Sequence, residues 1–175
     1  MISRRDFLDR CLPLAAILCP GVNLLGRVPD VPSVTFREAL PIESGIKWVH
    51  ANAHSEQRYL PETFPPGVAI FDYNDDGLMD ILFVNSGETP FFHPATPLHS
   101  ALYRNNGDGT FTDVTGAAGM TANFFGMGVA VGDYDGDGRQ DVFLSGYDKS
   151  ILYHNNGDGT FTDVTAESGI MAPGW

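Results

Sequence analysis

A segment of fourteen residues occurs twice in this chain with a single difference. LYRNNGDGTFTDVT, residues 102–115, returns as LYHNNGDGTFTDVT, residues 152–165. Each copy follows an acidic stretch, which reads GVAIFDYNDDGLMDILF at residues 67–83 and GVAVGDYDGDGRQDVFL at residues 128–144. Repeats of this length are supersecondary units that bury their apolar faces against neighbouring copies. The repeat therefore constrains the fold more than any other feature of the sequence.

The unequal spacing of the repeated segments shows that the first copy contains an insertion. The acidic stretches start sixty-one residues apart, whereas the fourteen-residue segments start fifty apart. The difference arises because the first copy carries the Pro-rich insertion SGETPFFHPATPLHS, residues 86–100, between its acidic stretch and its fourteen-residue segment. A weaker third echo, VTFREALPIESGI at residues 34–46, matches the segment at 159–170. The chain thus contains two clear repeats and a leading fragment.

Each repeat is predicted to form β-strands. Short apolar runs such as GVAIF and GVAVG end in an acidic turn, and DILFV and DVFLS follow it. The NNGDG segments carry Asn-Gly and Asp-Gly, the strongest short-range hairpin signals. No window shows apolar residues at helical spacing for long enough to compete. Three or four short strands per unit are typical of a propeller blade. The expected fold class is all-β, with about two β-propeller blades of short antiparallel strands plus the leading fragment.

Four segments are expected along the chain. They are an export signal over residues 1–28, a lead-in with a partial repeat over 29–66, a first repeat over 67–127 and a second over 128–175. Propellers close their rings with about four to eight blades. The array is therefore expected to be a truncated piece of a longer one, and missing blades or other copies are needed to close a propeller.

The two acidic stretches predict a pair of calcium sites. They align as D-x-N-x-D-G-x-x-D and D-x-D-x-D-G-x-x-D. Alternate side chains of a curled loop point to one centre, and glycine at the sixth position permits the positive φ of the reversal. Six to eight oxygen ligands suit Ca²⁺. The predicted ligands are Asp72, Asn74, Asp76, the Leu78 carbonyl and Asp80 in the first turn, and Asp133, Asp135, Asp137, the Arg139 carbonyl and Asp141 in the second.

Other interpretations of these turns fit less well. An EF-hand needs a glutamate at position twelve and flanking helices, whereas Phe83 and Leu144 stand there among β-type residues. Mg²⁺ favours fewer protein ligands than the pattern offers. A solvated turn without metal is the remaining alternative, and two matched copies argue against it. The second turn, with four carboxylates, is expected to bind Ca²⁺ more tightly at low salt than the first, with three carboxylates and an amide.

The N-terminus predicts export. SRRDFL, residues 3–8, precedes a moderate apolar run and resembles the twin-arginine signal pattern, with Asp9 where lysine is usual. The run contains two prolines and is short for a membrane span. Both cysteines, Cys11 and Cys19, lie inside it, so the mature chain would hold no disulfide. A periplasmic or extracellular location is expected, with no stable membrane span in the mature chain.

The charge of the chain argues against polyanionic partners. The formal net charge of −12 argues against nucleic acid and against anionic membrane surfaces, both of which need a basic footprint.

The motifs together resemble a known family. The acidic turns and the NNGDGTFTDVT hairpins resemble the FG-GAP/VCBS-type repeats of integrin α-subunit propellers and many exported bacterial proteins. The lead-in at residues 44–77 is similar to that of proteins pairing such repeats with an ASPIC/UnbV domain, the cartilage-acidic-protein-like group. The resemblance covers residues 34–175. It implies a seven-bladed propeller with Ca²⁺ bound by loops on its rim, and a C-terminal ASPIC/UnbV region that is missing here.

Catalytic motifs are absent from the sequence. It has no G-x-S-x-G elbow, H-E-x-x-H, P-loop or dinucleotide-binding glycine turn. Glu62 has no partner base in the sequence, and His154, which replaces Arg104 between the copies, is expected at the surface. We expect a non-catalytic binding or scaffold module for a protein or glycan ligand. The alternative is the N-terminal fragment of an extracytoplasmic hydrolase or lyase whose catalytic part is missing.

Overall fold

The computed structural model describes residues 36–63, 65–90 and 92–170. The chain divides into two compact units, residues 1–38 and 39–175, and the strands of the described residues belong to the second. The predicted export signal at 1–28 lies outside the described residues. Within the described ranges, no helix has the length and apolar character that a membrane crossing requires.

Two four-stranded antiparallel sheets make up the unit of residues 39–175, each with its strands in chain order. The prediction of an all-β fold with two blade-like repeats is confirmed, and the two sheets do not close into a ring. The first sheet consists of β1 (Val68–Phe71), β2 (Asp80–Phe83), β3 (Ala101–Asn105) and β4 (Phe111–Asp113). The second consists of β5 (Gly126–Gly132), β6 (Asp141–Gly146), β7 (Ile151–Asn155) and β8 (Phe161–Asp163).

Among the residues that the structure describes, helical structure is limited to single turns. The described helices are α2 (Pro41–Ser44), the 3₁₀ turn η2 (Leu60–Thr63) and α3 (Thr165–Ser168). Both α-helical turns end at a glycine in the left-handed conformation, Gly45 and Gly169, which closes a short helix without steric cost.

The hairpins form where the sequence predicts them, through side chains within the turn. In the first, the N–H of Gly107 donates to Asn105 Oδ1 over 2.9 Å, and the Thr110 N–H and hydroxyl both donate to Asp108 Oδ1. Gly107 and Gly109 have φ values of 80° and 88°, which only glycine adopts at little cost. The second hairpin repeats these contacts. This geometry is local, so it follows directly from the repeated sequence.

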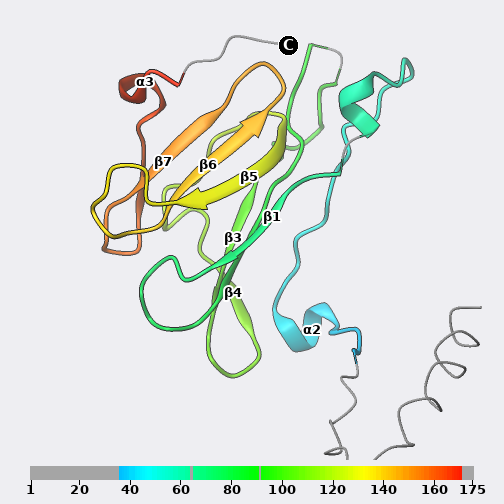
Figure 1. The fold of residues 1–175 in the computed structure, drawn as a ribbon. Coiled ribbons are helices and arrows are strands. Elements are labelled where there is room, and N and C mark those ends of the chain that lie inside the picture. The colour runs from blue at the N-terminus through cyan, green and yellow to red at the C-terminus, as the bar shows by residue number, and fades with distance from the viewer. Residues whose placement is uncertain (1–35, 64, 91, 171–175) are drawn as a thin grey trace, which may run out of the picture. The chain divides into compact units, whose positions relative to one another are not determined.

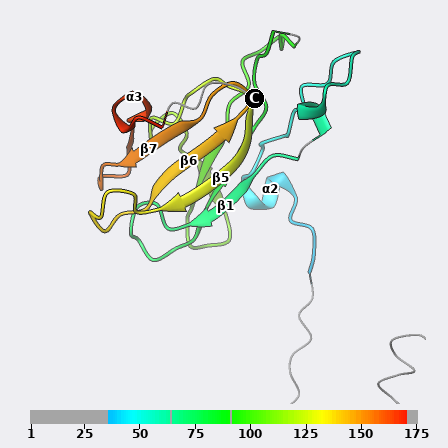
Figure 2. The ribbon, with the colours of Figure 1, turned by 45° about the horizontal axis from the view of Figure 1, so that its top comes forward.

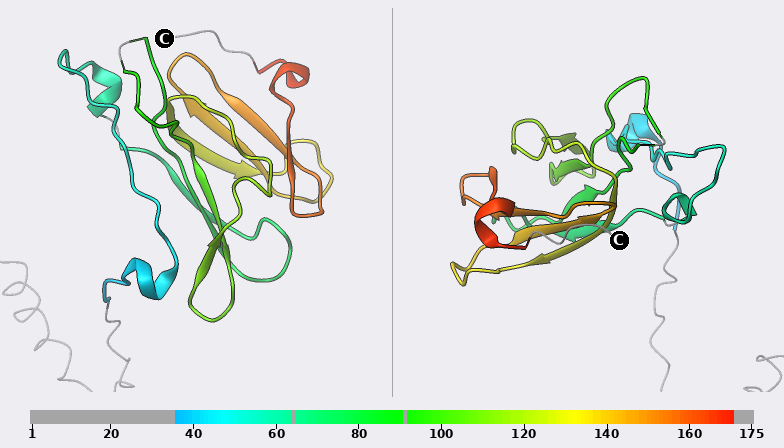
Figure 3. Two further views of the ribbon diagram at one scale, coloured as in Figure 1. Left: turned by 180° about the vertical axis from the view of Figure 1, so that it is seen from behind. Right: turned by 90° about the horizontal axis from the view of Figure 1, so that it is seen from above.

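A single apolar core joins the two sheets. Leu82 and Leu102 of the first sheet, and Val84 directly after β2, belong to the same buried cluster as Val142 and Leu144 of the second sheet. The two sheets are stacked, with β1 contacting β5, and Figure 3 shows the layers from above. Burying these side chains on one face of each sheet provides the main stabilisation, because neither sheet alone can cover both of its faces.

The chain segment that precedes each sheet docks onto it in the same way. The Lys47 N–H donates to the Tyr103 hydroxyl of β3 over 3.2 Å, and the Ala122 N–H donates to the Tyr153 hydroxyl of β7 over 3.3 Å. The weak third echo at residues 34–46 thus has a structural counterpart in its described part, because α2 and the residues after it hold the first sheet as residues 114–122 hold the second.

Glycines set the distance between the sheets. A methyl group on Gly126 would lie 2.5 Å from Val84 Cγ1 and 2.9 Å from the Asn85 carbonyl oxygen. The Gly126 N–H donates to that same carbonyl over 3.0 Å. The second sheet therefore begins in direct backbone contact with the segment that follows β2.

We expect Gly126→Ala to destabilise the stacked sheets by about 1–3 kcal/mol, the usual cost of overpacking a filled contact. Gly132→Ala, at the other end of β5, is the matched control because an added methyl there meets nothing within 4 Å. Urea unfolding of both variants measures the difference. Equal midpoints for the two variants would contradict the close approach.

Candidate metal centre

The two acidic turns occupy equivalent places in the fold. Residues 72–79 connect β1 to β2, and residues 133–140 connect β5 to β6. Both turns project from the same end of the stacked sheets, as Figure 1 and Figure 2 show. The β2–β3 insertion lies at the opposite end.

The first turn is closed by hydrogen bonds from its backbone N–H groups to its own aspartate side chains. Asp72 accepts the N–H groups of Asp76 over 3.1 Å and of Gly77 over 2.8 Å. The Leu78 N–H donates to Asp76 Oδ1, and Asn74 Nδ2 donates to Asp76 Oδ2. Gly77 has a φ of 85°, as the sixth position of the pattern predicts. The turn thus curls around the side chain of its first aspartate.

The second turn has the same design with one more carboxylate. Asp133 accepts N–H groups from Gly136, Asp137 and Gly138 over 2.7–3.1 Å. The bond from Gly138 is the main reason why the pKa of Asp133 lies below its ordinary value, and the other two N–H groups add to the effect against partial burial. Asp133 therefore stays ionised, as a cation ligand must. The guanidinium of Arg139 pairs with Asp137 Oδ2, and the backbone N–H of Arg139 donates to Asp137 Oδ1.

A buried aspartate ends each turn. Asp80 has no exposed surface and accepts the N–H of Tyr73 over 3.1 Å and of Asn105 over 2.7 Å. Burial raises the pKa of Asp80; these two bonds oppose the shift, and the carboxylates of Asp76 and Asp72 reinforce it. A nearby cation would relieve this cost of holding a negative charge in the interior.

Asp141 repeats the arrangement in the second sheet. It is 1 % exposed and accepts the N–H of Tyr134 over 3.1 Å and of Asn155 over 2.7 Å. The last predicted ligand of each turn is therefore also a structural link between the turn and the hairpin that comes after it.

The second turn brings carboxylates together. Asp133, Asp135 and Asp141 each place one oxygen within 4.8 Å of the others. A second group at the same turn joins Asp135 and Asp137 to His154 under the same criterion. Among the described residues, the first turn contains no such group of three acidic or histidine side chains.

The first turn offers an amide instead. The Oδ1 atom of Asn74 is buried and has no hydrogen-bond partner. A buried acceptor without a donor is costly, and a bound cation would satisfy it. The residues present therefore fit the oxygen-rich site that the sequence predicts. The ligand roles of the ten predicted residues, including the Leu78 and Arg139 carbonyls, stay predictions.

Sequence reasoning missed two features of this region. His154 was expected at the surface, but its ring lies against the second turn and its side chain is 24 % exposed. Asn155 Nδ2 donates to the Tyr73 carbonyl over 2.8 Å, although the two residues are 82 positions apart, and to the Gln140 carbonyl over 3.1 Å. The only sequence signal for His154 is that its position alone differs between the hairpin copies.

Glu62 serves a local structural role. Its buried carboxylate accepts the N–H groups of Ser55 over 2.8 Å and of Tyr59 over 3.2 Å, together with the Ser55 hydroxyl. Burial acts to raise the pKa of Glu62, but these hydrogen bonds outweigh it and the net pKa is lowered. His54 Nδ1 lies 4.0 Å away. The carboxylate thus organises residues 55–63.

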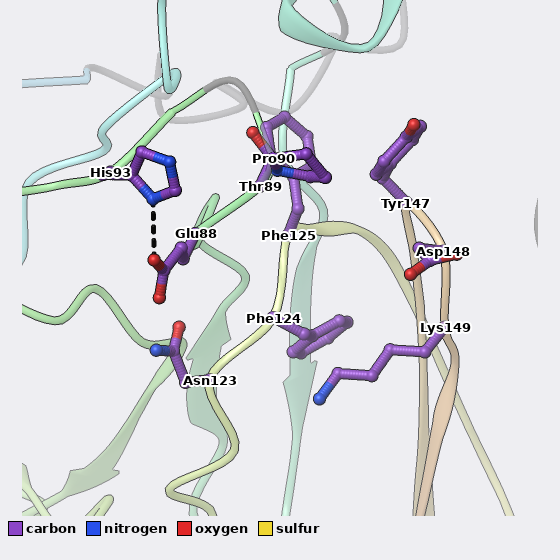
Figure 4. Close-up of a pocket in the computed structure, with 10 residues that line it drawn as sticks. All are labelled: Glu88, Thr89, Pro90, His93, Asn123, Phe124, Phe125, Tyr147, Asp148 and Lys149. Atoms are coloured by element: carbon purple, nitrogen blue, oxygen red, sulfur yellow. Dashed lines mark hydrogen bonds and ion pairs between the residues drawn. The ribbon is translucent and has the colours of Figure 1, made fainter.

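A hollow of about 440 Å³ lies at the end opposite the acidic turns. The insertion and the β6–β7 connection line it, and Figure 4 shows the side chains. Lys149 Nζ lies 5.8 Å from the centroid of the Phe124 ring, and His93 pairs with Glu88 over 2.7 Å. Its lining combines aromatic surface with polar groups, which is typical of ligand-binding surfaces.

The comparisons with known proteins agree with this architecture. The model of the FG-GAP-like repeat family matches residues 72–144 and 133–175. Each match begins at the first aspartate of an acidic turn. No curated protein matches the chain. The two repeated four-stranded units define a β-propeller-type repeat protein, the class in which binding modules are common. The chain belongs to the FG-GAP-like repeat family, since the matches cover more than half of its length.

We expect Asn155→Ala to cost about 1–3 kcal/mol more stability than Asn105→Ala, because a buried carbonyl loses its donor. Asn105 is the matched control: its Nδ2 donates only to the Met79 carbonyl, the counterpart of Gln140, and has no bond equivalent to that with Tyr73. Chemical unfolding of the two variants measures the difference, and equal losses would show that the link between the two turns contributes nothing.

Proposed function

We propose that this chain is an exported calcium-binding β-propeller repeat protein that acts as a non-catalytic binding or scaffold module. The observation that supports the proposal most directly is the clustering of Asp133, Asp135 and Asp141 within 4.8 Å in a turn whose backbone is already closed. A cation would bind there to ligands that the fold has preorganised, so little ordering would be needed on binding.

The proposed ligands of Ca²⁺ are Asp72, Asn74, Asp76, the Leu78 carbonyl and Asp80 in the first turn, and Asp133, Asp135, Asp137, the Arg139 carbonyl and Asp141 in the second. A carboxylate has about four lone pairs, so an oxygen that accepts a backbone N–H can still bind a cation. When bound, Ca²⁺ would supply the positive charge that offsets the repulsion among these carboxylates. Ca²⁺ would also cross-link each turn, a task that no disulfide could perform in the mature chain because both cysteines lie in the predicted signal.

We expect Ca²⁺ to raise the thermal midpoint relative to chelator, since a ligand that binds only the native state stabilises it by about 2.7 kcal/mol at one hundred times its Kd. At low salt, Asp137→Ala should lose more Ca²⁺ affinity than Asp76→Ala, because it removes a ligand from the site with more carboxylates. Isothermal titration calorimetry measures both.

Asp148→Asn is the control, since it removes a negative charge from the β6–β7 connection without touching either turn. Its Ca²⁺ binding should match that of the unchanged chain. Equal losses in the two alanine variants would contradict the ranking of the sites, and no uptake of Ca²⁺ by the unchanged chain would remove the proposal.

Export is proposed from the paired arginines at residues 4 and 5 and the apolar run after them. Arg4→Lys combined with Arg5→Lys should retain the full chain in the cytoplasm, because a twin-arginine signal is read by a receptor. Cell fractionation measures the location. Unchanged export of the double variant would rule out this route.

The proposed partner is a protein or a glycan. The insertion at residues 86–100 is the part that one repeat has and the other lacks, and it lines the hollow in Figure 4. Variation between repeats concentrates in such loops when they carry recognition. Probing glycan arrays and candidate proteins with the chain in Ca²⁺ tests this role. Binding that persists when the insertion is shortened to the SGYDKS length of the second copy would place the partner elsewhere.

A further inference from the structure

We propose that His154 makes the second acidic turn a mixed carboxylate and imidazole site that takes Zn²⁺, with Asp135 and Asp137 as the other protein ligands. The inference rests on the proposed function in one respect, namely that this turn binds a cation. It adds a nitrogen ligand, and with it a different preferred metal, to one of the two turns.

The position of His154 brings its ring to the turn. It comes directly after Tyr153 in β7, and because successive side chains of a strand point to opposite faces, the burial of Tyr153 in the core directs His154 away from it. His154 Nδ1 lies 3.2 Å from Asp135 Oδ2 and 3.4 Å from Asp141 Oδ1. Its Nε2 lies 4.0 Å from Asp137 Oδ2.

One nitrogen of the His154 ring is buried and faces carboxylates. His154 Nδ1 has no exposed surface and no hydrogen-bond partner of acceptable geometry. Two carboxylate oxygens face it, so a lone pair on this nitrogen would repel them. Either a proton on Nδ1 or a cation between the groups resolves the conflict. A divalent cation does so for the nitrogen and the carboxylates together.

The donor spacing fits a small cation. Donors bound to tetrahedral zinc at 2.0–2.1 Å are about 3.3–3.4 Å from one another. The observed separation of 3.2 Å between His154 Nδ1 and Asp135 Oδ2 matches that spacing. Asp135, Asp137 and His154 are also grouped within 4.8 Å. Three protein ligands with a fourth position for water form a common zinc arrangement.

The choice of metal depends on the nitrogen. Imidazole suits zinc and its neighbours in the transition series, whereas sites of oxygen alone suit calcium and magnesium. The equivalent position in the first repeat is Arg104, a cation that cannot be a ligand. The first turn is therefore expected to bind oxygen-preferring cations only. Arg139 competes at the second turn, since Zn²⁺ must share or displace its pairing with Asp137.

His154→Gln tests the proposal, because it removes the imidazole without adding charge. In titrations of the tag-free full chain, the variant should lose Zn²⁺ affinity by at least about tenfold, the lower range for losing one supporting group at a metal site. Its Ca²⁺ affinity should change by less than about threefold, since Ca²⁺ relies on oxygens. Because Cys11 and Cys19 can also bind Zn²⁺, the measured quantity is the difference between the unchanged chain and the variant.

Two further variants complete the experiment. His93→Gln removes an exposed histidine from the insertion and should leave Zn²⁺ binding unchanged. His154→Arg restores the residue of the first repeat, so it is expected to fold even if the glutamine variant does not, and it should lower the ratio of Zn²⁺ to Ca²⁺ affinity. Co²⁺ bound to the unchanged chain should give visible absorption bands that both His154 variants lose.

The outcomes separate the two proposals. Unchanged Zn²⁺ affinity in both His154 variants would show that the imidazole is not a ligand and would overturn the inference. Equal loss of Zn²⁺ and Ca²⁺ in His154→Gln would overturn it too, because the imidazole would then select no metal. If the chain takes up no Ca²⁺ but binds Zn²⁺ through His154, the calcium proposal fails and this inference stands.

Discussion

The buried aspartate at the end of each acidic turn holds the repeat together. Asp80 and Asp141 lie out of contact with water, and each accepts one N–H from the start of its turn and one from the following hairpin. A buried carboxylate persists only when its oxygens are paired, so the turn and the hairpin must keep their places together. Both loops at that end of each sheet are thereby fixed by one side chain.

The stacking of the sheets depends on backbone approach as much as on apolar burial. Leu82 and Val142 are fully buried in one core, but the close contacts at Gly126 and Gly67 set how near the strands can come. Asn155 then ties the second hairpin to the Tyr73 carbonyl in the first turn. Because Asn155 also donates to the Gln140 carbonyl, one side chain connects the two acidic turns.

The turns divide their carboxylate oxygens between two tasks. Asp72 and Asp133 accept several N–H groups of the backbone curl, whereas Asp135 accepts one, from Asp137, and places its other oxygen near His154. The bonds from backbone N–H groups order the turn without a cation. The remaining carboxylate oxygens keep a negative charge that a cation would neutralise. The one difference between the two fourteen-residue segments, Arg104 in the first and His154 in the second, gives the two repeats different groups at this position. Near-identical sequence therefore does not mean equivalent chemistry.

The sequence by itself determined the features that depend on neighbouring residues: the strands, the Asn-Gly and Asp-Gly hairpins, and the acidic turns closed by Gly77 and Gly138. Positive φ and bonds from a side chain to a backbone two to five positions away are local, so a repeated segment repeats them. Only the tertiary structure decided where His154 lies and that Asn155 reaches Tyr73, because both depend on how the second hairpin meets groups distant in the chain. The grouping of Asp135, Asp137 and His154 likewise needs β7 to pack beside the β5–β6 turn, and no pattern of spacing records that contact.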